Sequence, residues 1–265
     1  MAPRPPAGYL LLVQANPNFQ VAALPFRPEG LKAVVFDVDG TLYRQAPLRR
    51  AMLFRLFGAY AMRPFEGWRT VRALSAYRHA QEALRDAATT DVADAQLARA
   101  CARTDLDRAV VQQCVERWME REPLPILGRF RYRGLVEFLE ACRGQGLQLA
   151  ALSDYPANDK LKALGVAELF DLVLCAQSPE IGVFKPNPRG LAVALQRLGV
   201  SPANCLYVGD RPEVDAEAAH AAGMASVIVS RSTGKPADRH TTVSGYPQLH
   251  ALLFGGGEPR RLAAA

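Results

Sequence analysis

The sequence predicts an α/β protein with a doubly wound, Rossmann-like parallel sheet and an inserted α-helical cap. Three observations predict this fold class. A short apolar, β-branched run begins at Ala33 and ends in two aspartates; residues 44–128 carry apolar side chains at spacings of three and four; and from Tyr132 onward apolar strands alternate with amphipathic helices. Such alternation is typical of a parallel sheet covered by helices on both faces.

The same patterns divide the chain into segments. Residues 1–30 are rich in Pro, Ala and Asn and predict an N-terminal extension. The core is expected to comprise residues 31–43 and 129–254, with the helical cap, 44–128, inserted after the first strand. Residues 255–265 are expected to be a flexible tail.

The cap is expected to contain several helices and an arginine-rich surface. Sixteen arginines and no lysine lie between Arg44 and Arg131, and most are interpreted as a solvated helix face. Arg44, Arg49 and Arg50 are candidates for contacting an anionic group of a substrate, second to any group that reacts at the strand ends. The alternative for each is a surface role. The expected cap helices are 48–63, 68–88, 92–102 and 106–122.

The core is expected to begin with the strand after Ala33 and to alternate helices and strands from residue 135. The expected helices are 135–143, 159–164, 190–198 and 214–222, and the expected later strands are 147–152, 172–176, 205–208 and 226–229, the last being the final strand.

Composition excludes several classes of protein. The net charge is +6, but 26 acids accompany 32 basic residues and no basic run is present, so no nucleic-acid partner is expected. No apolar run is long enough to span a bilayer, so no membrane partner is expected. Five cysteines without a C-x-x-C pair fit a reduced protein, which predicts a cytoplasmic location.

Chemistry-bearing residues follow the expected strands at their carboxyl ends. Asp37 and Asp39 follow the first strand, Ser153 follows the strand at 147–152, and Asp210 follows the strand at 205–208. Ligands bind at this edge of doubly wound sheets. Carboxylates at the tip of a buried strand are costly unless a metal, a phosphate or a catalytic task uses them.

These residue types suit the cleavage of a phosphate ester. Asp37 is placed to attack phosphorus, and Asp39 can protonate the leaving oxygen and then deprotonate water. Asp210 and Asp215 add carboxylates beside Asp37, and so many acids together imply a hard cation, for which Mg²⁺ is suited. Thr41, Ser153 and Lys185 would hold the phosphoryl oxygens, which completes the list of candidate site residues.

Four motifs in order resemble those of the haloacid dehalogenase-like hydrolases, a family dominated by phosphatases. They are Asp37-x-Asp39-Gly-Thr41, Ser153, Lys185 in Phe-Lys-Pro, and Gly-Asp210 through Asp215. The resemblance covers about residues 31–230 and is to the phosphatase type with a helical cap inserted after the first motif, as in phosphoglycolate phosphatase-like members. It implies an aspartyl-phosphate on Asp37 and a metal held by Asp37, Asp210, Asp215 and the backbone carbonyl of Asp39.

Each residue also has an ordinary structural alternative. Ser153 could cap the next helix, and Lys185 could lie on the surface before a proline. Asp215 could be an exposed acid in the first turn of a helix, and Gly209-Asp210 could be a simple turn. Only the joint order of the motifs argues against these alternatives.

Several residues discriminate among the family's reactions. Asp39 disfavours dehalogenation, whose enzymes lack this acid, and a cap without lysine excludes Schiff-base cleavage of phosphonates. Asp154 departs from the asparagine frequent in relatives and would repel a phosphate unless paired or turned away. Arg133 replaces a frequent proline.

The sequence therefore predicts a magnesium-dependent phosphatase acting on a small phosphate ester, as a monomer or homodimer. A phosphomutase of the same family and a non-catalytic phosphate-binding regulatory protein are the alternatives.

Overall fold

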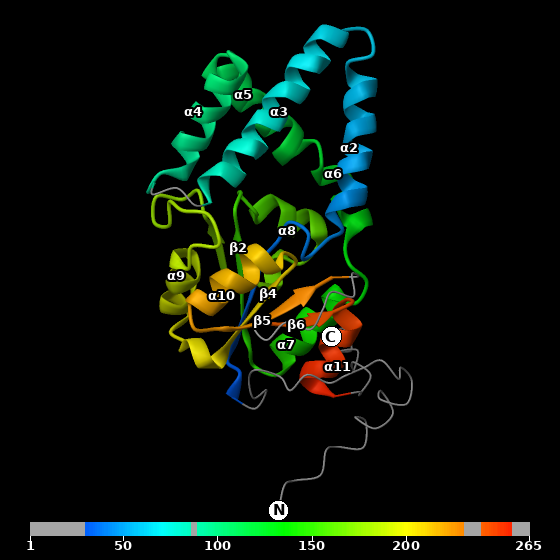
Figure 1. Ribbon diagram of the computed structural model, residues 1–265. Coiled ribbons are helices and arrows are strands. Elements are labelled where there is room, and N and C mark those ends of the chain that lie inside the picture. Colours follow the sequence, from blue (N-terminus) through cyan, green and yellow to red (C-terminus); the bar gives the residue numbers. More distant parts are fainter. Residues whose placement is uncertain (1–29, 86–88, 231–239, 256–265) are drawn as a thin grey trace, which may run out of the picture.

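The computed structural model describes residues 30–85, 89–230 and 240–255. The predictions of an N-terminal extension and of a flexible tail therefore fall almost wholly outside the described residues. Six parallel strands form one sheet in the order β3-β2-β1-β4-β5-β6, with a layer of helices on each face (Figure 1). The strands are β1 Ala33–Phe36, β2 Gln148–Ser153, β3 Leu172–Cys175, β4 Cys205–Gly209, β5 Ala225–Val229 and β6 Thr241–Val243.

The strands are buried on both faces, and alternate residues face different helices. Val34 and Phe36 of β1 belong to the apolar cluster that includes residues of α7, α8 and α11. Ala33 and Val35 belong to the opposite cluster, with residues of α9 and α10. This two-residue period is the geometry of a strand. The core helices are α7 Leu135–Gly144, α8 Asn158–Leu164, α9 Arg189–Leu198, α10 Glu217–Ala221 and α11 Tyr246–Phe254.

The doubly wound α/β prediction is confirmed, with one correction at the edge of the sheet. The expectation that the strand after Met224 is the last one is wrong, because β6 pairs in parallel with β5 beyond it. β6 has only three residues, Thr241–Val243. A two-residue period cannot be recognised over so short a segment.

The cap stands over the carboxyl ends of the strands (Figure 1). Its side-chain cluster contains Ala73, Tyr77, Leu97 and Val111, and the helix α2 contributes none of the residues of that cluster. α2 therefore lies outside this apolar cluster, although Arg55 of α2 pairs with Glu122 of the cap. The cap helices are α2 Gln45–Ala59, α3 Pro64–Leu84, α4 Val92–Thr104 and α5 Arg108–Val115, and the short α6 Leu124–Leu127 leads back to the core.

Among the described residues, the helices are all too short or too polar to cross a membrane.

Candidate active site

The carboxyl ends of the three central strands carry the candidate residues. Asp37 follows β1, Ser153 is the last residue of β2, and Asp210 follows β4. β1 lies between β2 and β4, where the chain changes its direction of travel across the sheet. Doubly wound folds form their ligand crevice at this switch point.

Asp37 is 6% exposed, and both of its carboxylate oxygens have partners. Lys185 Nζ donates to Oδ1 over 2.6 Å, and Thr41 Oγ1 donates to Oδ2 over 2.9 Å. Burial nevertheless raises the pKa of Asp37 well above its ordinary value, and the nearby Asp215 and Asp210 raise it further against the opposing effect of Lys185. Asp37 therefore sits where a second cation would stabilise its charge.

Lys185 is buried and lies between two carboxylates. Its Nζ donates to Asp37 and, over 2.7 Å, to Asp215 Oδ1, and it also donates to the hydroxyl of Tyr207 over 3.0 Å. The alternative of a surface lysine is therefore wrong. Burial opposes the charge of Lys185, but its carboxylate neighbours outweigh burial and raise its pKa well above the ordinary value.

Asp215 is 1% exposed, so the alternative of an exposed helix acid is also wrong. Its Oδ2 accepts the backbone N–H groups of Asp210 and Arg211 over 3.1 and 3.0 Å. Burial alone would raise the pKa of Asp215, but Lys185 and these amides outweigh it and lower the pKa. Asp215 thus stays ionised and fixes the loop that carries Asp210.

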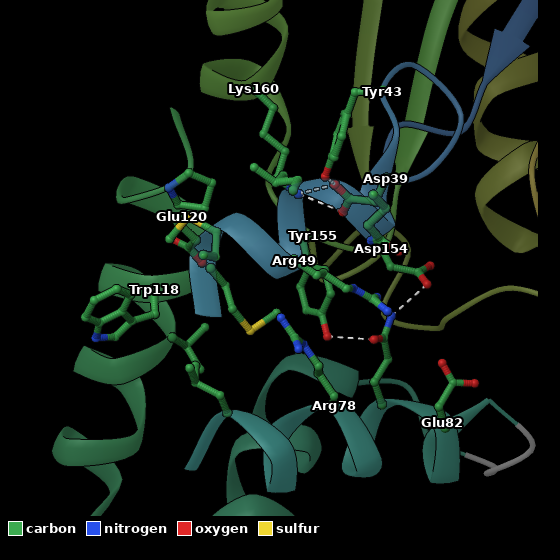
Figure 2. Close-up of a pocket in the computed structure, with 18 of the residues that line it drawn as sticks. Asp39, Tyr43, Arg49, Arg78, Glu82, Trp118, Glu120, Asp154, Tyr155 and Lys160 are labelled. Carbon is green, nitrogen blue, oxygen red and sulfur yellow. Dashed lines mark hydrogen bonds and ion pairs between the residues drawn. The ribbon is translucent and has the colours of Figure 1, made fainter. Parts of the chain in front are cut away.

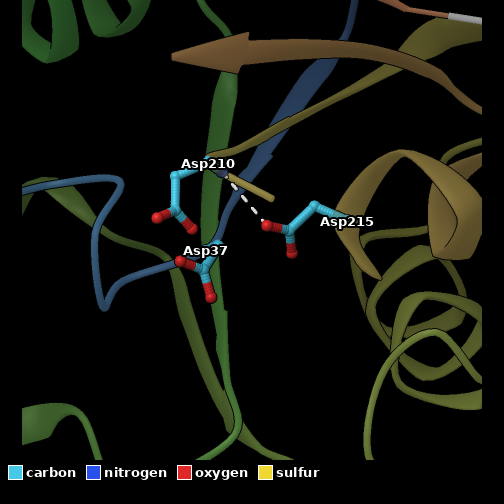
Figure 3. A group of neighbouring side chains, drawn as sticks. All are labelled: Asp37, Asp210 and Asp215. Atoms are coloured by element: carbon cyan, nitrogen blue, oxygen red, sulfur yellow. Dashed lines mark hydrogen bonds between the residues drawn. The ribbon is translucent and has the colours of Figure 1, made fainter. Parts of the chain in front are cut away.

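Asp37, Asp210 and Asp215 converge at one point (Figure 3). Each offers an oxygen that lies within 4.8 Å of the oxygens of the other two. Burial, and then repulsion by Asp215, raises the pKa of Asp210 to about 7. Three carboxylates are thus gathered around a single lysine, and this donor set fits a hard divalent cation.

A glycine at position 40 leaves room for the carboxylate of Asp210 in the cluster. Gly40 has φ +108°, and a Cβ there would lie 2.1 Å from Asp210 Oδ2. The absence of a side chain therefore leaves the space that the Asp210 carboxylate fills.

Asp39 faces the cavity rather than the three-carboxylate cluster. Lys160 Nζ lies 2.7 Å from each of its carboxylate oxygens, and the Tyr43 hydroxyl donates to Oδ1. Burial would raise the pKa of Asp39, but Lys160 and Tyr43 outweigh it and lower the pKa. Asp39 is therefore held as a carboxylate beside the tip of β1.

Ser153 does not cap the following helix, because α8 begins at Asn158 with Ala157 as its cap residue and no side-chain cap. The Ser153 hydroxyl is fully buried and accepts the backbone N–H of Tyr155 over 3.3 Å. Thr41 is also fully buried, and its carbonyl accepts the Tyr246 hydroxyl over 3.0 Å. Both candidate phosphate ligands are thus rigidly placed.

Asp154 is paired, so its charge is offset beside the expected phosphate. Gln81 of α3 and Arg85, the residue that follows α3, reach its Oδ2 over 2.8 and 2.9 Å. The other oxygen, Oδ1, is buried and has no hydrogen-bond partner among the described residues. Arg85 also donates to the carbonyl of Lys185 over 2.6 Å, which joins the cap to the loop that carries the lysine. Arg133, the other departure from the family pattern, is exposed.

A cavity of about 670 Å³ opens above these residues, between the cap and the carboxyl ends of the strands. Asp37, Asp39 and Lys185 are among its lining residues, and α2 and α3 each supply part of its wall, including Arg49 and Arg78 (Figure 2). Of the three arginines proposed to read a second anion, Arg49 lines this cavity, whereas Arg44 and Arg50 do not.

The sequence interpretation missed the residues that hold Asp39 and Asp154. Lys160 lies in a helix of ordinary amphipathic pattern, Gln81 lies in a long cap helix, and Arg85 directly follows that helix. One signal was available, because the chain has only five lysines among its 32 basic residues. Two of these five, Lys160 and Lys185, are buried in the site.

Comparison with known proteins agrees with this architecture. The chain is 30% identical over 204 residues to a glyceraldehyde 3-phosphate phosphatase of Methanopyrus kandleri, covering 76% of this chain and 84% of the relative. It is 31% identical over 224 residues to a phosphoserine phosphatase of Thermus thermophilus, covering 76% and 89%. A solved 2-haloacid dehalogenase of Pseudomonas syringae superposes with a TM-score of 0.56 at 25% identity, covering 84% and 98%.

The model of one protein family matches residues 31–223, which include every candidate site residue. The chain belongs to the haloacid dehalogenase-like hydrolases.

Proposed function

We propose that this hydrolase is a magnesium-dependent phosphatase that cleaves small phosphate monoesters through an aspartyl-phosphate on Asp37. One observation carries the proposal. Asp37 lies at the base of a cavity, held by Thr41 and Lys185 and grouped with Asp210 and Asp215. A nucleophile among cations and phosphate ligands is what phosphoryl transfer requires.

In the first half-reaction, a carboxylate oxygen of Asp37 attacks phosphorus. An Asp37–phosphorus bond forms and the ester P–O bond breaks, and Asp39, which must carry a proton when this step begins, gives that proton to the leaving oxygen. In the second half, Asp39 takes a proton from water as the water attacks phosphorus, which releases inorganic phosphate and restores Asp37. Thr41, Ser153 and Lys185 hold the phosphoryl oxygens throughout.

The metal would be held by the carboxylates of Asp37, Asp210 and Asp215 and by the backbone carbonyl of Asp39. Bound there, Mg²⁺ would offset the negative charge of the carboxylates and of the phosphoryl oxygens. The raised pKa values of Asp37 and Asp210 support this assignment, since both carboxylates lack sufficient positive charge nearby.

The presence of Asp39 favours ester hydrolysis over dehalogenation, the reaction after which one structural relative is named. A halide leaves without a proton, whereas an alkoxide needs one, and Asp39 lines the cavity two residues from the nucleophile. The relatives named as glyceraldehyde 3-phosphate and phosphoserine phosphatases support the same reaction class.

The test is turnover of p-nitrophenyl phosphate by the full chain, after treatment with EDTA and then with added Mg²⁺. We expect the wild type to be active only with the metal. We expect Asp37→Asn to form no phosphoprotein, either after EDTA treatment or with added Mg²⁺. Absence of wild-type turnover in a folded protein would overturn the proposal. Release of inorganic phosphate from ordinary esters distinguishes the phosphatase from a phosphomutase, which returns the group to an acceptor.

The remaining expectations concern location and assembly. The five cysteines are all free, and two of them, Cys142 and Cys205, are fully enclosed in the core. Free thiols support the cytoplasmic location predicted above. The expected monomer or homodimer is tested by light scattering of the purified chain.

A further inference from the structure

The cavity contains two arginines whose charge is not offset. Six lysines and arginines line it, and four of them form ion pairs with carboxylates: Arg85, Lys160, Lys185 and Arg211. The other two, Arg49 and Arg78, have no ion pair or hydrogen bond among the described residues.

Arg49 and Arg78 come from different helices, α2 and α3. Both side chains are among the residues that line the cavity (Figure 2). Partial burial, and then repulsion by Arg49, lowers the pKa of Arg78. Both residues keep solvent-exposed surface, as expected for groups in the wall of an open cavity. The fold thus holds two like charges together in a place that a ligand enters.

Among the described residues, the carboxylates of the cavity wall form no ion pair with Arg49 or Arg78. Glu82 pairs with Arg85 and Arg211 over 3.0 and 2.9 Å. Glu120, the other glutamate of the wall, forms no ion pair among the described residues, and burial and then Glu116 raise its pKa against the opposing effect of Lys160 and Arg121. An anion from the ligand is therefore the partner that Arg49 and Arg78 lack.

That anion is not the phosphoryl group under attack. Thr41 and Lys185, which contact Asp37, belong to the core, whereas Arg49 and Arg78 belong to the cap. A group bound by the arginines would therefore lie on the cap side of the cavity.

We propose that Arg49 and Arg78 form a second anion subsite, which selects phosphate monoesters whose leaving group carries a carboxylate or a second phosphate. This inference rests on the proposed phosphatase function. The planar guanidinium pairs with either group through two parallel hydrogen bonds. The subsite therefore recognises the anionic charge at the far end of a small substrate.

The test compares esters that differ only in that charge. Phosphooxy carboxylates with one to three methylenes, and the corresponding alkanediol bisphosphates, are each matched with a hydroxyalkyl phosphate of equal length. We expect wild-type kcat/KM to favour one of the charged esters by about tenfold or more, mainly through KM, since a charge-assisted hydrogen bond has an effect of that order. Arg49→Gln and Arg78→Gln should each reduce that ratio about tenfold.

Arg50→Gln is the matched control, because Arg50 is the neighbour of Arg49 on α2, is exposed, and does not line the cavity. It should keep the wild-type ratio of kcat/KM for charged and neutral esters.

Calorimetric titration of Asp37→Asn with the same ester pairs repeats the comparison without turnover. Equal affinity for charged and neutral esters, or a preference that survives both glutamine variants, overturns the subsite. Failure of every ester to turn over would overturn the phosphatase instead, while the calorimetry still decides the subsite.

Discussion

Lys160 Nζ lies 2.7 Å from both carboxylate oxygens of Asp39, although the two residues are 121 positions apart in the chain. The pair joins the start of α8 to the loop after β1. Burial would raise the pKa of Asp39, and Lys160, with the Tyr43 hydroxyl, reverses that effect. Because Asp39 must carry a proton to release an alkoxide, Lys160 acts on the step that we assign to Asp39.

Replacement of Lys160 should therefore change the pH dependence of the reaction. In Lys160→Met, burial of Asp39 is no longer opposed by the ammonium, so the pKa of Asp39 rises. The group must be protonated in the first half-reaction, and activity is lost as pH rises through its pKa. The alkaline limb of kcat/KM for an alkyl phosphate should thus move to higher pH, by about one unit or more.

Lys162→Met is the control for this experiment. Lys162 lies on the same helix two residues on, is exposed, and pairs only with the exposed Asp159. Its pH profile should match the wild type. The assigned role of Lys160 is contradicted if the alkaline limb of kcat/KM moves to lower pH in Lys160→Met. It is also contradicted if this limb moves by the same amount in Lys160→Met and Lys162→Met.

Asp39→Asn should separate substrates by the quality of their leaving group. An alkoxide needs a proton from Asp39, whereas p-nitrophenolate leaves without one. We expect kcat/KM to fall by about 10²–10⁴-fold for an alkyl phosphate and far less for p-nitrophenyl phosphate. An equal loss for both esters, with unchanged thermal unfolding, would show that Asp39 does not supply the proton.

Much of the site could be predicted because it is tied to the ends of strands. A buried strand has a recognisable composition, and its carboxyl end is fixed by the fold, so Asp37, Ser153 and Asp210 could be placed together. The loops beyond the strands were less certain, since Lys185 and Asp215 each had an ordinary surface interpretation. Their burial in the structure removes those interpretations.

The contacts between the cap and the core could not be predicted. Whether Arg85 reaches Asp154, and whether Arg78 lines the cavity, depends on the orientation of α3 over the sheet, and a helical period does not encode this orientation. Lys160 was missed for the same reason, because a single lysine in a short helix carries no positional signal. The sequence pattern indicates which face is apolar, but not which residue of another element lies opposite.

The metal-free protein should lose stability as pH rises from about 4 to about 7. The folded-state pKa of Asp210 is about 7, above its ordinary value of 3.8, so in this range the folded chain holds a proton that the unfolded chain releases. The free energy of unfolding in EDTA should then fall by about 1–3 kcal/mol more in wild type than in Asp210→Asn.

Urea unfolding at both ends of that range measures the effect. Added Mg²⁺ should restore stability at the higher pH and have little effect at the lower one, because protons compete with the metal for the same carboxylate. Asp159→Asn removes an exposed acid and should retain the wild-type dependence. If Asp210→Asn and wild type change in parallel, Asp210 is not the group that titrates.

The same substitution at two glycines should have opposite effects. A Cβ at Gly40 would lie 2.1 Å from Asp210 Oδ2, in a backbone with φ +108°. Gly40→Ala should therefore destabilise the fold by about 1–3 kcal/mol and weaken Mg²⁺ binding, because the displaced carboxylate leaves the cluster. Gly58, near the end of α2, has nothing within 4 Å of its Cβ position, so Gly58→Ala should stabilise by up to about 1 kcal/mol. Thermal unfolding in EDTA and calorimetric titration with Mg²⁺ measure the two effects separately. If Gly40→Ala binds Mg²⁺ as the wild type does, the Asp210 carboxylate does not hold the metal, since it could not keep its position beside the new methyl group.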